Sequence, residues 1–415
     1  MRALINSRRT TEQYLESNFR EVIGMADTII GYVKQYGDYT FKEKPMNDVD
    51  SLVLCQFAYL KFDGMVPGVL QDRTFVSIRR VAAHADYEHL YADTRYEKSN
   101  RALFEAMLRS RRFSRLKMNY YVNIVEPAKE TQFSAITFLL EDGTIYLAYR
   151  GTDETIVGWK EDFNMAYLFP IPGQTYSLKY LEVVAGKVSG SFYVGGHSKG
   201  GNLAICAAMQ CAAEIQERII KIYNMDGPGF RPEVLKQFDY EKIAGRIVKI
   251  LPHSSLIGMI FETDTRYHVV ESKGFGLLQH DPYTWLVKDG GFVYAKDLYR
   301  SSKFTNSTIN EWVLSLDEEH LKTFVNTVFQ VLSASQAKDL IEFTADWRKS
   351  MNGVIAALRE VDDETKKILK DMIKALAVLG RKRLINTQLK GVGAESTKQK
   401  ISSGSTGRRS MKKRE

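Results

Sequence analysis

One five-residue segment, residues 196–200, restricts the fold of this chain more than any other part of its sequence. It reads Gly-His-Ser-Lys-Gly, follows the apolar run at residues 190–195 and precedes the small-residue run Gly-Gly-Asn-Leu-Ala. A Gly-x-Ser-x-Gly segment between a strand and a helix is typical of a nucleophile elbow, a sharp turn in which larger neighbours of the serine would clash. The sequence therefore predicts a strand, a strained turn at Ser198 and a helix.

Apolar runs on both sides of this turn predict the surrounding sheet. Strands are expected at residues 120–125, 134–140, 144–149, 190–195, 218–224 and 246–251. The turn Glu141-Asp142-Gly143 makes the second and third of these a hairpin, and helices are expected at residues 177–189 and 231–243. Strands that are apolar throughout and alternate with helices predict an α/β fold, with a mostly parallel sheet covered by helices on both faces.

The chain is expected to have four parts. Residues 1–30 form a helical lead-in, and residues 31–300 form the α/β domain, which includes a helix from Asp48 to about Gly64. Residues 301–380 form a helical appendage, whose first helix opens with the capping box of Ser315 and Glu318. Residues 381–415 form a polar, aperiodic tail that is predicted to be disordered.

The net charge of +8 is concentrated in that tail. Residues 381–415 hold eleven basic and two acidic side chains, a net of +9, so the remainder of the chain is close to neutral at −1. The tail therefore predicts peripheral contact with an anionic membrane or with nucleic acid, and a solvated, solubilising end is the alternative.

Composition excludes several other classes of protein. A chain with 44% hydrophobic residues and nine prolines is neither wholly disordered nor collagen-like. The three cysteines have no paired spacing, so we expect buried thiols in a reducing compartment, with no metal site. No secretory signal and no transmembrane segment is recognised, and a cytoplasmic location is expected.

Three further motifs carry a resemblance to a known family. They are Tyr149-Arg150-Gly151-Thr152-Asp153 with Trp159 and Asp162, the segment at residues 224–230, and Gln279-His280-Asp281-Pro282. Together with the elbow they resemble the class 3 lipases of the α/β-hydrolase fold, and more closely a lipase-like bacterial family of uncharacterised function. The resemblance implies an oxyanion hole formed by the backbone N–H groups of Thr152 and Lys199, without metal or organic cofactor.

A serine nucleophile needs a base and an orienting acid, which follow it in the chain in this fold. We expect His280 as the base, because it lies in a loop after the last core strand, with His253 as the alternative. His268 and His320 lie in regular elements, and His197 is assigned no role.

The acid departs from the family pattern, because residues 251–256 contain no carboxylate. Asp226 ends the strand after the elbow helix and is the expected acid, with Glu262 and Asp264 as alternatives. Lys199 is a second departure, since an apolar residue is usual there, and its ammonium group is expected in solvent.

The expected function is hydrolysis of a small-molecule ester or lipid through an acyl-enzyme. Residues 153–176 are rich in apolar side chains, and they are expected either to cover the site as a lid or to pack in the core. The alternative function is that of a catalytically inactive binding or scaffold protein, which the missing carboxylate and Lys199 favour.

Overall fold

The computed structural model describes residues 27–71, 74–92, 94–153, 156–274, 276–298, 310–311, 313–314 and 316–334. Almost all of the expected lead-in helix, the two helices expected after residue 334 and the basic tail lie outside these residues. The chain divides into two compact units, Met1–Val325 and Asn326–Glu415, and only residues 326–334 of the second are described. The boundaries expected from the sequence stay predictions.

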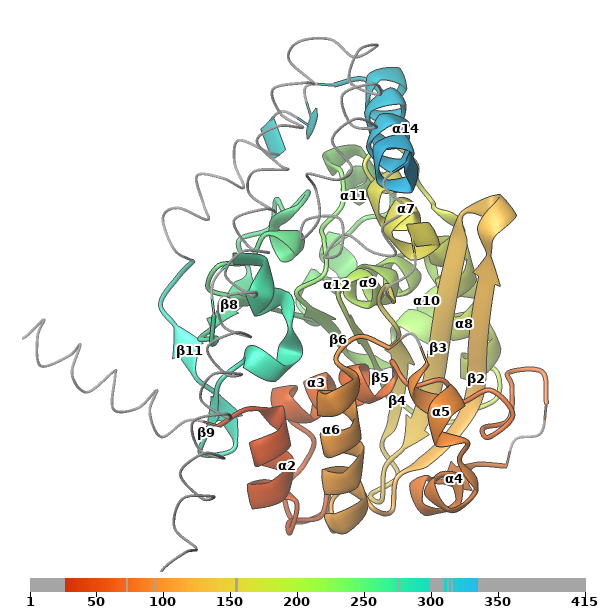
Figure 1. Cartoon of the computed structure of the whole chain (residues 1–415), viewed down its shortest axis with the longest axis vertical. Coiled ribbons are helices and arrows are strands. Elements are labelled where there is room, and N and C mark those ends of the chain that lie inside the picture. The colour runs from red at the N-terminus through yellow and green to blue at the C-terminus, as the bar shows by residue number, and fades with distance from the viewer. Residues whose placement is uncertain are drawn as a thin grey trace, which may run out of the picture. The chain divides into compact units, whose positions relative to one another are not determined.

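A nine-stranded sheet runs through the described part of the first unit (Figure 1). In spatial order its strands are β1 (Val76–Ser77), β2 (Lys117–Glu126), β3 (Thr131–Leu139), β4 (Ile145–Tyr149), β5 (Phe192–His197), β6 (Ile219–Met225), β7 (Ile247–Pro252), β8 (Tyr267–Val270) and β11 (Tyr294–Ala295). Strands β4 to β8 are parallel, whereas β1 to β4 are joined antiparallel and β11 pairs antiparallel with β8. The α/β class is confirmed, and the sheet is mixed because both of its edges are antiparallel.

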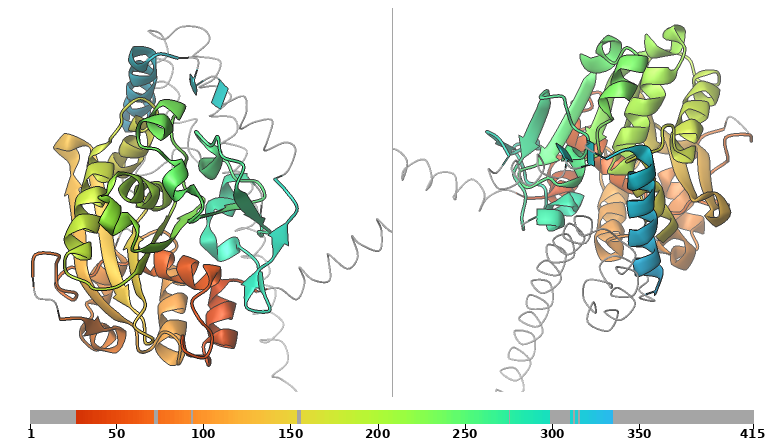
Figure 2. Two further views of the ribbon diagram at one scale, coloured as in Figure 1. Left: turned by 180° about the vertical axis from the view of Figure 1, so that it is seen from behind. Right: turned by 90° about the horizontal axis from the view of Figure 1, so that it is seen from above.

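Helices cover both faces of this sheet, as the alternation along β4 demonstrates. Tyr146 and Ala148 lie in one hydrophobic core, whereas Leu147 and Tyr149 lie in the other. The first core contains side chains of α2 (Ile29–Tyr36), α3 (Asp48–Phe57) and α6 (Glu97–Arg109), and the second contains those of α8 (Pro172–Ala185) and α9 (Lys199–Gln210). The red and orange helices of the first group face the viewer in Figure 1, and the yellow-green helices face the viewer in the left panel of Figure 2.

Two predicted helices are shorter than the sequence pattern indicated. The helix expected from Asp48 to Gly64 ends at Phe57, although the following apolar residues stay buried in turns. The helix expected at residues 231–243 is divided into α11 (Pro232–Gln237) and α12 (Glu241–Ala244). Asp239 between them has a φ of 51°, a left-handed conformation that an α-helix cannot contain.

Further helices, a hairpin and short turns complete the described elements. They are α4 (Ile78–His84), α5 (Tyr87–Tyr91), α7 (Ile156–Asn164), α10 (Ala213–Gln216), α14 (Glu318–Ala334), the β9–β10 hairpin (Val287–Lys288, Gly291–Phe292) and the short 3₁₀ turns η1 (Pro127–Lys129), η2 (Ile257–Met259), η3 (Gly276–His280) and η4 (Pro282–Thr284). The three cysteines are free and buried, as expected. None of the helices in the described ranges has the length and hydropathy required to cross a bilayer.

Candidate functional site

The elbow has the geometry that its sequence predicts. Strand β5 ends at His197, helix α9 begins at Lys199, and Ser198 between them has φ 59° and ψ −134°. A positive φ is uncommon for any residue but glycine, and such strain is typically found where a side chain must be presented in a fixed direction. Ser198 is also the N-cap of α9, so the unpaired N–H groups of the first helical turn lie beside it.

Both glycines of the elbow are required by close backbone contacts. A Cβ atom at Gly200 would lie 2.1 Å from the carbonyl oxygen of Tyr149, at the end of β4. A Cβ atom at Gly196 would lie 2.2 Å from the carbonyl carbon of Gly200. The glycines therefore allow β4, β5 and the start of α9 to meet without a side chain between them.

Gly200→Ala is expected to destabilise the protein by about 1–3 kcal/mol or more, because the Tyr149 carbonyl belongs to the rigid centre of the sheet. Urea unfolding of the variant and of the wild type measures this difference. Gly245→Ala is the matched control, since a Cβ atom there meets nothing within 4 Å. Equal destabilisation of the two variants would contradict the role given to Gly200.

Asp226 and His280 form a buried pair close to the elbow. Met225 is the register partner of His197, and the Ser198 N–H donates to the Met225 carbonyl at 2.9 Å, so Asp226 follows directly beside Ser198. His280 Nδ1 lies 2.6 Å from Asp226 Oδ2, and the Ser255 hydroxyl donates to Asp226 Oδ1 at 2.5 Å. Both oxygens of the Asp226 carboxylate are therefore engaged, and its orientation is fixed.

Two asparagines shape the turn that carries Asp226. The N–H of Gly227 donates to Asn224 Oδ1 at 2.7 Å, and Asn202 Nδ2 on helix α9 donates to the Gly229 carbonyl at 3.0 Å. A Cβ atom at Gly227 would lie 2.3 Å from the Ser198 carbonyl oxygen. The turn after β6 is thus held against the elbow by the side chains of Asn224 and Asn202, and the lack of a side chain at Gly227 allows the close approach.

The other candidate acids have different partners. Glu262 is paired with Lys249, and Asp264 is paired with Arg266 at 2.8 Å. Of the three carboxylates that the sequence left open, the structure places only Asp226 on His280.

The alternative base, His253, is also engaged elsewhere. His253 lies 3.2 Å from Glu271 and 2.7 Å from Gln279 Nε2, while His268 and His320 are exposed. Among the described residues none forms a hydrogen bond with Ser198 Oγ, so the contact between Ser198 and His280 is not made in this state. Catalytic hydrogen bonds are often longer in unliganded proteins than in their complexes.

The two residues expected to form the oxyanion hole lie on neighbouring strand ends. Thr152 follows β4, Lys199 follows the elbow serine, and their backbone N–H groups meet no acceptor within the described ranges. A Cβ atom at Gly151 would lie 3.0 Å from Ser198 Cβ, which places the Thr152 loop against the elbow serine. The Thr152 hydroxyl donates to Asp162 Oδ2 at 2.5 Å, which fixes this loop.

The expectation that the Lys199 ammonium lies in solvent is wrong. Lys199 is 1% exposed, and its Nζ lies 2.8 Å from Glu161, 3.1 Å from the Gln132 carbonyl and 3.5 Å from Asp162. Burial alone would lower the pKa of Lys199, but the Glu161 and Asp162 carboxylates outweigh it and raise that pKa. The lysine is therefore a charged part of the interior, and Asp162 connects it to Thr152.

His197, to which the sequence pattern assigned no role, contacts the loop of the expected base. Its Nε2 lies 2.9 Å from the carbonyl oxygen of His280, and its Nδ1 lies 3.1 Å from the hydroxyl of Tyr59. Tyr59 is 138 residues away in the chain, so no local pattern could have predicted this contact.

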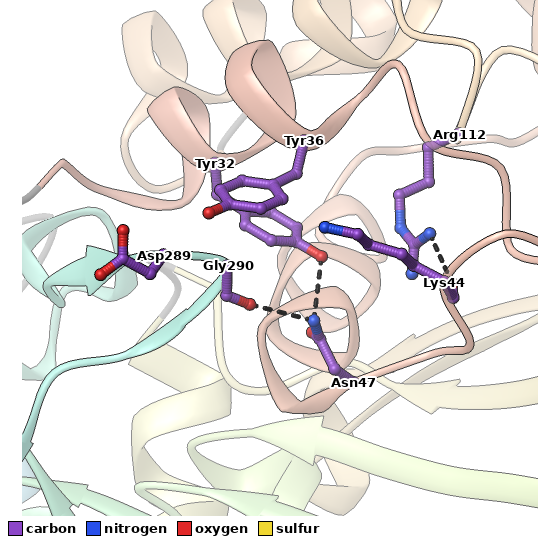
Figure 3. A pocket seen from close by; sticks show the side chains of 7 residues that line it. All are labelled: Tyr32, Tyr36, Lys44, Asn47, Arg112, Asp289 and Gly290. Atoms are coloured by element: carbon purple, nitrogen blue, oxygen red, sulfur yellow. Dashed lines mark hydrogen bonds between the residues drawn. The ribbon is translucent and has the colours of Figure 1, made fainter.

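A cavity of about 110 Å³ lies at a separate place, between α2 and the β9–β10 turn (Figure 3). Its Asn47 side chain donates to Tyr32 and Gly290, and Lys44 lies over the rings of Tyr36 and Tyr39. Arg112 in its wall is saturated by Asp50 and backbone carbonyls. These groups have structural partners, and none is a nucleophile next to a base.

No cluster of three metal-binding side chains occurs in the described ranges.

Fold and site together define an α/β protein with a strained serine turn beside a buried aspartate–histidine pair. The Mbeg1-like family model matches residues 107–330, more than half of the 415 residues, and the chain belongs to the Mbeg1-like family. No curated protein and no solved structure matches. The family match overturns the resemblance to class 3 lipases and to a lipase-like bacterial family, because short glycine and serine motifs report a local backbone geometry rather than descent.

Proposed function

We propose that the protein is a serine hydrolase of the α/β-hydrolase fold that cleaves carboxylic esters through an acyl-enzyme. The observation that supports this proposal best is the 2.6 Å contact between Asp226 and His280 beside the strained turn at Ser198. An aspartate on Nδ1 leaves the lone pair of His280 on Nε2, which is the tautomer that accepts a proton from a serine. The Ser255 hydroxyl on the other carboxylate oxygen helps to keep Asp226 in that position.

In the first half of the reaction Ser198 Oγ attacks the ester carbonyl carbon, and its proton passes to Nε2 of His280. The carbonyl oxygen becomes an oxyanion that accepts hydrogen bonds from the N–H groups of Thr152 and Lys199. When the intermediate collapses, the alcohol leaves with the proton from His280, and the acyl group stays on Ser198. Water then attacks the acyl-enzyme by the same route, His280 accepting its proton, and releases the acid.

The two sequence features that favoured an inactive scaffold are compatible with catalysis at this site. The carboxylate that is missing from residues 251–256 has a counterpart in Asp226, and Lys199 belongs to a buried ion pair rather than blocking the site. The substrate is proposed to be a small-molecule ester or lipid, and contact of the basic tail with an anionic membrane or nucleic acid stays a prediction.

A series of p-nitrophenyl esters with acyl chains of increasing length tests the proposal. We expect an initial burst of p-nitrophenol equal to the enzyme concentration, followed by steady turnover, because the acyl-enzyme forms before it is hydrolysed. Prior treatment with a stoichiometric fluorophosphonate should remove both phases. If folded protein shows neither burst nor turnover with any ester, the scaffold hypothesis replaces the hydrolase.

A further inference from the structure

The imidazole of His197 links three parts of the fold that are distant in sequence. It is 3% exposed, ends β5 immediately before Ser198, and lies between Tyr59 and the backbone of His280. The rings of His197 and His280 are 4.6 Å apart at an angle of 34°. His280 is therefore held at two points, at its ring by Asp226 and at its carbonyl by His197.

The partners of His197 determine which of its nitrogens carries the proton. A carbonyl oxygen only accepts hydrogen bonds, so His197 Nε2 must donate to His280 O. In the neutral ring Nδ1 is then an acceptor, and the Tyr59 hydroxyl donates to it. Removing that hydroxyl would allow the proton to move to Nδ1, which would turn the Nε2 lone pair towards the carbonyl of His280.

The charge of His197 is set by its surroundings. Burial lowers the pKa of His197 well below its ordinary value, and the neighbouring His280 lowers it further. The ring is therefore neutral, and it does not oppose the positive charge that His280 acquires when it accepts a proton.

We propose that His197 is a positioning residue for the base, and that Tyr59 fixes it in the tautomer that binds the His280 carbonyl. The proposal rests on the proposed function for its effect on turnover, whereas the geometry that it describes is independent of activity. Through His197 the turn that carries the nucleophile is connected to the loop that carries the base, so the two move as one unit.

The test uses the full chain and three variants. His197→Gln keeps an amide N–H at the place of Nε2, His197→Met fills the space without a donor, and Tyr59→Phe removes only the hydroxyl. Tyr193→Phe, on the same strand as His197, is the matched control, because the Tyr193 hydroxyl makes no hydrogen bond within the described residues.

The first readout is the proton on His280 Nδ1. A proton in a short bond to a carboxylate resonates far downfield in the NMR spectrum, and Asp226→Asn identifies the signal by removing it. We expect the signal in the wild type, in His197→Gln and in Tyr193→Phe. In His197→Met and Tyr59→Phe it should broaden or shift upfield, because the His280 loop is no longer held.

The second readout is turnover of the p-nitrophenyl ester. We expect kcat to fall about 10²-fold in His197→Met and about tenfold in Tyr59→Phe, with KM little changed and with recovery in His197→Gln. A wild-type signal and wild-type kcat in both His197→Met and Tyr59→Phe would overturn the proposal. If the wild type has no esterase activity, the proposed function fails, and the NMR signal alone still decides whether His197 positions His280. If His197→Met does not fold, the result for Tyr59→Phe decides the positioning role.

Discussion

Asp226→Asn is expected to lower kcat for ester hydrolysis on the order of 10⁴-fold while the protein stays folded. The asparagine Oδ1 can still accept the Ser255 hydroxyl, but its NH₂ group now faces His280 Nδ1. His280 Nδ1 must then accept a hydrogen bond from that NH₂ group. The neutral imidazole of His280 therefore carries its proton on Nε2, and Nε2 cannot take a proton from Ser198. Steady-state kinetics with a p-nitrophenyl ester measures the loss.

The fold should tolerate this change, because asparagine adopts the left-handed conformation of Asp226, with its φ of 53°, as readily as aspartate. Asp264→Asn is the matched control, since that carboxylate is paired with Arg266 and not with a histidine. The control should keep kcat within a few-fold of the wild type. An Asp226→Asn protein with wild-type kcat would show that another group orients the base.

Lys199→Met is expected to lower the free energy of unfolding by about 3–5 kcal/mol. The methionine fills the space of the lysine stem but leaves the buried carboxylate of Glu161 without its counter-ion. An unpaired charge in the interior loses its solvation and gains no attraction in return. Urea unfolding followed by circular dichroism measures the change.

Two further variants test whether the loss of stability comes from the buried ion pair itself. Lys199→Met combined with Glu161→Gln should recover at least half of the lost stability, because the charge of Glu161 is removed with that of its partner and the amide oxygen can still accept a backbone N–H. Asp162 loses the more distant Lys199 contact but keeps the hydrogen bond from Thr152. Lys242→Met breaks the exposed pair with Asp239 and should cost no more than about 1 kcal/mol. A Lys199→Met protein as stable as the Lys242→Met control would contradict the stabilising role of the buried pair.

Most of the sheet could be predicted because its strands are marked by local composition. The runs at residues 190–195, 218–224 and 246–251 are apolar and bounded by turn residues, and each corresponds to a parallel strand of the structure. The two helices that were predicted to be longer than they are show where local composition fails to predict helix boundaries. Apolar residues after Phe57 signalled burial, which a packed turn provides as well as a helix does.

The site could be predicted where the fold itself imposes an order. Ser198 and Asp226 follow paired residues of β5 and β6, so a serine turn and the next strand end had to lie side by side. His280 was chosen for its place in a loop after the core strands, and the structure joins it to Asp226. Their catalytic roles stay predictions.

The partners of Lys199 and His197 could not be predicted from the sequence. Glu161 lies 38 residues before Lys199, and Tyr59 lies 138 residues before His197. A lysine is most often solvated, and no local pattern distinguishes one that finds a buried carboxylate. Such contacts depend on how α7 and the turn after α3 pack against the elbow, which periodicity along the chain does not determine.

The most direct test of the hydrolase proposal is to identify the residue that reacts with a fluorophosphonate. We predict one adduct per chain, located by peptide mass spectrometry on Ser198 and absent from Ser198→Ala. We also predict slower labelling of Asp226→Asn than of Asp264→Asn, because in Asp226→Asn the proton of His280 lies on Nε2 and the ring cannot activate Ser198. An adduct on another residue, or no adduct on folded wild-type protein, would contradict the proposal that Ser198 is the nucleophile.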